Sequence, residues 1–178
     1  MKRMTALFLT VAVFLSLAAC TKAAVTRDDA PAEIKQALEQ LPEIVAEPEG
    51  EVKPQASLKA LNKACGSKIV TPENRTVTNE LFETTTFDGT KVGQYVFTVD
   101  DLPCAVRFCS DIYKDASGVV NADGNPVFDG VKGDIAFAED CIIGRWNTTA
   151  GQYVLIAATD DISAFDTLFE EFKATIPG

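Results

Sequence analysis

The chain has 178 residues, with 16 lysines and arginines, 26 aspartates and glutamates, and no histidine. Its formal net charge of −10 disfavours nucleic-acid binding, because an acidic surface repels the phosphate backbone. The lack of histidine excludes imidazole acid–base catalysis and the Ser-His-Asp and Cys-His catalytic arrangements.

The N-terminus has the parts of an export signal. Lys2 and Arg3 supply a positive start, and residues 6–15 form an apolar run. That run is too short to span a bilayer, which needs roughly 20 apolar residues. Residues 17–20 (LAAC) look like the bacterial lipobox, in which a peptidase cuts before a lipid-modified cysteine. We therefore expect a lipoprotein signal peptide over residues 1–19 and a lipid anchor on Cys20.

The anchor predicts the location of the mature protein. A single acyl chain binds a membrane only reversibly, whereas a diacylglyceryl group on Cys20 supplies two fatty chains of the palmitate type. The 159 mature residues would carry 14 basic against 26 acidic side chains, a net charge of −12, so charge attraction to anionic lipid is not expected. We expect a cell-membrane protein, held by its acyl chains on the extracytoplasmic face.

Residues 20–55 predict an acidic tether. Four prolines interrupt it: Pro31, Pro42, Pro48 and Pro54. This composition favours a solvated spacer between membrane and domain. The alternative is a short partner-binding helix from Pro31 to Leu41, with Pro31 in its first turn and Pro42 at its end.

Residues 56–178 predict a single α+β domain, long enough for one hydrophobic core. Ser57 is a suitable N-cap for a helix that stops before Gly66. The expected strands are 82–87, 92–99, 104–110, 134–138 or 141–147, and 152–158, with a hairpin turn at 88–89. Apolar residues at helical spacing predict an amphipathic helix over 161–175. The result is an antiparallel sheet of about five strands, with both helices packed on one face and a long loop over 114–133.

Four cysteines remain in the predicted domain: Cys65, Cys104, Cys109 and Cys141. An even number in an exported chain favours two disulfides. Cys104 and Cys109 should not pair with each other, because five strand residues span ~16 Å and a bridge needs Cα atoms within ~7 Å. Two pairings stay open: Cys65–Cys104 with Cys109–Cys141, or Cys65–Cys109 with Cys104–Cys141.

The sequence predicts no metal or other cofactor. A four-cysteine zinc site is disfavoured, because zinc ligands usually come as closely spaced pairs. Residues 121–125 (NADGN) are rich in oxygen ligands, but they lack the spacing of an EF-hand calcium loop and favour a plain turn.

Several short segments resemble a group of small surface lipoproteins of Gram-positive anaerobic bacteria. The segments are Ser57-Leu58, Lys63-Ala64, Gly66, Ile69-Val70, Pro72, 93–97 (GQYVF), Arg107-Phe108, 115–119 (DASGV), Arg145-Trp146 and 152–155 (QYVL). The resemblance covers most of residues 57–176 and implies a lipid-anchored extracytoplasmic domain. The group has no assigned activity. The four cysteines look like additions to its pattern, so no pairing is implied.

These observations favour a non-enzymatic binding or envelope-interaction module, with the 114–133 loop and the tether as its expected contact regions and a protein or envelope partner. One alternative is a wall-active hydrolase or enzyme accessory that uses carboxylates. Such an enzyme needs a cleft with two convergent acidic side chains. Another is a secreted inhibitor that inserts a loop into a foreign enzyme.

Overall fold

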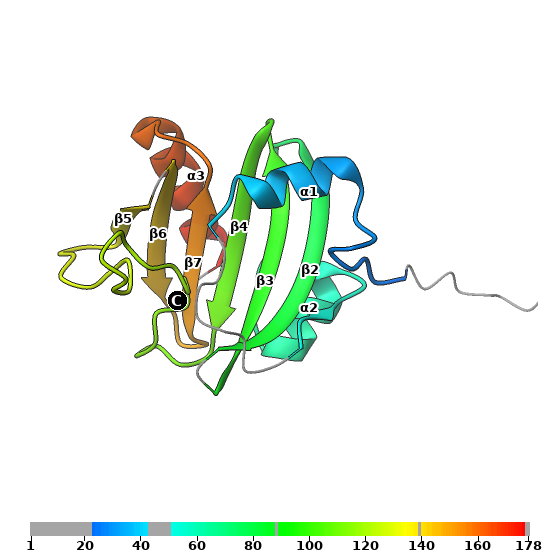
Figure 1. The fold of residues 1–178 in the computed structure, drawn as a ribbon, viewed down its shortest axis with the longest axis horizontal. Coiled ribbons are helices and arrows are strands. Elements are labelled where there is room, and N and C mark those ends of the chain that lie inside the picture. The colour runs from blue at the N-terminus through cyan, green and yellow to red at the C-terminus, as the bar shows by residue number, and fades with distance from the viewer. Residues whose placement is uncertain (1–22, 43–50, 88, 139, 177–178) are drawn as a thin grey trace, which may run out of the picture.

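The computed structural model describes residues 23–42, 51–87, 89–138 and 140–176 (Figure 1). The predicted signal peptide, Cys20 and Asp88 of the predicted hairpin turn lie outside the described residues. The helices and strands are α1 (Ala32–Glu39), β1 (Lys53–Pro54), α2 (Leu58–Cys65), β2 (Val77–Phe87), β3 (Thr90–Val99), β4 (Leu102–Cys109), β5 (Ile135–Ala138), β6 (Cys141–Asn147), β7 (Gln152–Ala157) and α3 (Ile162–Thr175).

The strands form one antiparallel sheet in the order β1-β2-β3-β4-β7-β6-β5. Two runs of consecutively paired strands, β1–β4 and β5–β7, meet where β4 pairs with β7. The predicted α+β class and antiparallel sheet are confirmed. The sheet has seven strands instead of about five, because both segments offered as alternatives form strands and the short β1 pairs with β2 at one edge.

Helices α2 and α3 pack on the same face of the sheet, here called the α2/α3 face. Helix α2 begins at the predicted cap, where Ser57 Oγ accepts from the Ala60 N–H at 3.2 Å. Helix α3 is capped by Asp161, the first residue of the predicted helix, whose Oδ1 accepts from the Ser163 N–H at 2.9 Å. Helix α3 approaches β6 at Gly144, where an added Cβ would lie 2.6 Å from the Phe169 ring. Only glycine therefore allows this close packing.

Helix α1 lies across β2, β3 and β4 on the opposite face, here called the α1 face (Figure 1). Its inward side chains Ile34 and Ala37 are buried, as is Leu41 just beyond its end. The described part of the predicted tether therefore belongs to the domain. The boundary predicted at residue 56 differs from the structure, since the packed chain includes α1 and β1.

The connection between β4 and β5 covers the rest of the α1 face. Ala116, Val119, Val127 and Phe128 are buried in the same apolar cluster as Ile34. The predicted 114–133 loop is thus a packed cover with a buried inner side. The sheet has a hydrophobic core on each face.

The packing of α1 predicts the effect of Ile34→Ala. We expect it to lower the free energy of unfolding by about 2–5 kcal/mol, because it removes a buried aliphatic side chain from the α1 face. Urea denaturation of the full chain measures this, with the exposed neighbour Gln36→Ala as control and little change expected there. Equal stability of the two variants would mean that residues 23–42 behave as a spacer.

Candidate functional site

Three polar side chains cross the α1 face on adjacent strands. Glu83 of β2 is paired in register with Gln94 of β3, and Gln94 with Arg107 of β4. Their exposed fractions are 3%, 3% and 2%. Because side chains alternate along a strand, all three point toward the layer formed by α1 and the β4–β5 connection. Such buried polar groups are costly unless they are hydrogen-bonded.

Hydrogen bonds join these residues into one network that begins at Arg27. Arg27 Nε and Nη2 donate to the Glu83 carboxylate at 3.0 and 2.9 Å. Gln94 Nε2 donates to the same carboxylate at 3.2 Å, and Gln94 Oε1 accepts from Arg107 Nε at 2.7 Å. The amide of Gln94 therefore has a fixed orientation, with its oxygen toward Arg107.

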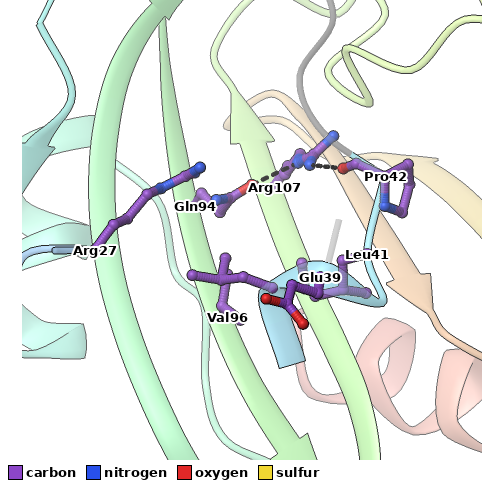
Figure 2. Close-up of a pocket in the computed structure, with 9 residues that line it drawn as sticks. Arg27, Glu39, Leu41, Pro42, Gln94, Val96 and Arg107 are labelled. Atoms are coloured by element: carbon purple, nitrogen blue, oxygen red, sulfur yellow. Dashed lines mark hydrogen bonds between the residues drawn. The ribbon is translucent and has the colours of Figure 1, made fainter. Parts of the chain in front are cut away.

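Arg107 ties three parts of the chain together. Besides Gln94 on the sheet, its guanidinium donates to the carbonyl of Pro42, close after the end of α1, at 2.8 Å (Figure 2). It also donates to the carbonyl of Ser117 in the β4–β5 connection. Each of these acceptors is neutral. The three bonds use three of the five N–H groups of the guanidinium.

Burial lowers the pKa of Arg107 to about 9, with the positive charge of Arg27 as a second cause. Asp115 and Glu83 act in the opposite direction. A pKa near 9 leaves the side chain charged at neutral pH. The site therefore holds a buried cation whose direct hydrogen-bond partners carry no charge.

A cavity of about 120 Å³ lies beside this cation, between α1 and the sheet. It is lined by Arg27, Leu38, Glu39, Leu41, Pro42, Gln94, Val96, Ala105 and Arg107. Its walls are aliphatic, and its polar side is formed by Gln94 and the two guanidinium groups. Figure 2 shows Arg27 and Arg107 on either side of Gln94 and the carboxylate of Glu39 directed away from Arg107. This combination suits a small molecule with an apolar body and a hydrogen-bond acceptor.

The four predicted disulfide residues, Cys65, Cys104, Cys109 and Cys141, carry thiols in the structure, so neither predicted pairing is formed. Cys104 faces the α2/α3 core and Cys109 the α1 core. Pairing therefore requires partners on matching faces.

The partners that share a face lie too far apart along the strands. The side chain of Cys65 lies beside Gly93, and Gly93 pairs with Phe108 of β4. Phe108 is four residues, or ~13 Å, along β4 from Cys104. On the α1 face, Cys109 pairs with Gln152 of β7, and Gln152 pairs with Asn147 of β6. Asn147 is six residues, or ~20 Å, along β6 from Cys141. Both separations exceed the ~7 Å between Cα atoms that a bridge allows.

The other pairing joins residues on opposite faces. Cys104 pairs with Ala157, which pairs with Ile142, the neighbour of Cys141, but the two thiols belong to different cores. The same holds for Cys65 and Cys109. The sheet itself separates these thiols.

The tyrosines, the tryptophan and the NADGN segment lie outside the cavity lining. Tyr95, Trp146 and Tyr153 lie in the α2/α3 core, whereas Tyr113 is exposed. Asn121 Oδ1 accepts from the backbone N–H groups of residues 123 and 125 at 3.0 Å each, which makes the NADGN segment a turn. In the described ranges, no group of three or more acidic or cysteine side chains could hold a metal ion.

None of the described helices is long and apolar enough to cross a membrane. Comparison with protein-family models, curated proteins and solved structures finds no match for this chain.

Sequence reasoning missed the cavity residues. Gln94 and Arg107 were singled out only within the family resemblance, and Glu83 only as part of the predicted strand 82–87. The available signal was a polar residue within each of three predicted strands, at positions that a common register brings side by side. The register itself was not predictable, so the three could not be joined into one network.

The cysteine geometry predicts four thiols in the native protein. When the full chain is unfolded in urea without reductant, iodoacetamide should modify residues 65, 104, 109 and 141 in full. Peptide mass mapping measures the modification, and a reductant-treated sample is the control. A disulfide-linked peptide pair that reductant separates would contradict the structure.

The Arg27–Glu83 ion pair predicts that removing one charge destabilises the protein more than removing both charges together would suggest. Arg27→Met should lower the free energy of unfolding by about 1–3 kcal/mol, because it leaves a carboxylate that is 3% exposed without its cation. The double variant Arg27→Met/Glu83→Met should be more stable than the sum of the single losses predicts.

The control for this cycle is Lys173→Ala, which removes the exposed Lys173–Glu170 pair and should change stability by at most about 0.5 kcal/mol. Urea denaturation of the wild-type chain, Arg27→Met, Glu83→Met and the double variant gives the cycle, and Lys173→Ala is measured beside them. Additive losses for Arg27 and Glu83 would show that the pair contributes no interaction energy.

Proposed function

We propose that this chain is a lipid-anchored, non-enzymatic binding protein on the extracytoplasmic face of a membrane, and that its ligand occupies the cavity beneath α1. The observation that carries the binding role is the cavity itself, where the charged, buried Arg107 lines an aliphatic space of about 120 Å³. A purely structural polar network would not need that space.

The proposed location rests on residues 1–20. The described residues limit how far the domain could lie from an anchor on Cys20. Arg27 is held on the sheet through Glu83, and it follows Cys20 by only seven residues. Seven extended residues span at most ~25 Å. An anchor on Cys20 would therefore keep the domain close to the membrane surface, in contrast to the long tether expected from composition.

The positions of the acidic side chains favour binding over hydrolysis. A glycosidase-like reaction needs two carboxylates that face one another across a substrate. Glu83 already accepts from Arg27 and Gln94, Asp100 accepts from Arg75, and Asp161 caps α3. Each of these carboxylates has a structural partner.

Fractionation of cells that express the full chain tests the proposed location. The wild-type product should lack residues 1–19, carry acyl mass on Cys20 and partition with membranes. Cys20→Ser should lose the acyl mass and leave the membrane fraction, whereas Cys65→Ser should behave like wild type. A wild-type product that retains Met1, or that is water-soluble without acyl mass, would refute the anchor.

A further inference from the structure

We propose that the cavity beneath α1 binds a small organic monocarboxylate, with its carboxylate against Arg107 and its short alkyl part against Leu38, Val96 and Ala105. This inference rests on the binding role proposed above and names the chemical class of the ligand. It is argued from four features of the cavity: charge, free donors, wall chemistry and volume.

The cavity lining holds two cations, Arg27 and Arg107, and one carboxylate, Glu39, which is directed away from Arg107 (Figure 2). Arg27 and Glu83 form a bidentate ion pair and offset one another. Arg107 donates only to neutral oxygens, and the nearby Asp115 uses Oδ1 to accept from the Ser117 N–H. A monoanion would give the buried Arg107 a direct counter-charge, whereas a dianion would place excess negative charge near Glu83.

The donors that remain on Arg107 suit a carboxylate. Three of its five N–H groups are engaged, one through Nε and one each through Nη1 and Nη2. One N–H is left on each terminal nitrogen, and charge-assisted bonds from a guanidinium to a carboxylate are stronger than bonds between neutral groups. Arg27 also lines the cavity, but its charge is paired with Glu83, so Arg107 is the cation that would meet the ligand.

The walls and the volume restrict the rest of the ligand. Leu38 and Leu41 line the cavity from the α1 side, and Val96 and Ala105 line it from the sheet. A cavity of about 150 Å³ accommodates a molecule the size of benzene, so about 120 Å³ accommodates about five or six non-hydrogen atoms. Propionate and butyrate have this size. A hydrated cation would meet two guanidinium groups and is disfavoured.

Arg107 also donates hydrogen bonds to the carbonyl groups of Pro42 and Ser117. A substitution of Arg107 could therefore reduce binding by disturbing the fold, and it would not test the ligand site alone. Ala105→Leu separates ligand binding from folding. Ala105 is fully buried and lines the cavity, and the larger side chain would fill the space without removing any hydrogen bond of Arg107. The matched control is Ala164→Leu, an exposed position on α3 on the other side of the sheet.

The experiment uses the full chain purified in mild detergent and titrated at constant ionic strength with propionate, butyrate and propionamide. Calorimetry or ligand-observed NMR measures affinity. Propionate and butyrate should each bind at least ten times more tightly than propionamide, which has a similar shape and no charge. Octanoate should bind at least ten times more weakly than butyrate, because it exceeds the cavity.

Ala105→Leu should reduce propionate affinity at least tenfold, and Ala164→Leu should leave it unchanged. Circular dichroism checks the fold of both. If Ala105→Leu does not fold, Leu38→Phe replaces it, since it fills the cavity from the half-buried α1 side. Equal affinity for propionate and propionamide, equal competition by chloride or phosphate, or no binding at millimolar propionate would overturn the proposal. Binding is measured in detergent, so a failure to bind propionate leaves the fractionation test of the Cys20 anchor unaffected.

Discussion

The burial of Arg107 in the middle of the sheet is the constraint on which the α1 face depends. An isolated charge transferred from water to a protein interior costs several kcal/mol, and it persists only where hydrogen bonds replace its hydration. Here the replacements come from three separate places: Gln94, the carbonyl of Pro42 and the carbonyl of Ser117. Meeting this requirement brings the end of α1 and the β4–β5 connection onto the sheet together.

Because the bonds of Arg107 hold the α1 layer on the sheet, the sheet has an apolar core on both of its faces. Strands β3, β4 and β7 are buried on both faces, with Tyr95 and Tyr153 against α2 and α3 and with Val96 and Ile156 against the α1 layer. Burial on both sides also explains why thiols suffice where bridges were expected. Burial raises the pKa of Cys104 and Cys109, which reduces the reactive thiolate, and two apolar layers supply stabilisation without cross-links.

Local signals predicted most of the elements, because caps and turns depend on a few neighbouring residues. Ser57, Gly66 and Asp161 mark helix ends in the sequence, and each has the expected role in the structure. The role of α1 was not predictable in this way, since Ile34, Ala37 and Leu38 are apolar at helical spacing but prolines and acidic residues surround them. The available clue was in another strand: residues 153–157 are apolar at both odd and even positions, which requires a cover on each face of the sheet. The cavity residues depend on strand register, which local signals do not specify.

The position of α1 in the chain links the proposed anchor to the proposed ligand. Helix α1 begins twelve residues after Cys20 and supplies Leu38 to the site, and Leu41 and Pro42 follow just beyond its end. Arg27, which precedes the helix, lines the same cavity. A chain of seven residues between Cys20 and Arg27 would hold this side of the cavity within ~25 Å of the acyl chains. A small carboxylate would then be bound close to the membrane surface. Arg107, whose direct hydrogen-bond partners are neutral, would supply the positive charge for that carboxylate on a protein that is otherwise acidic.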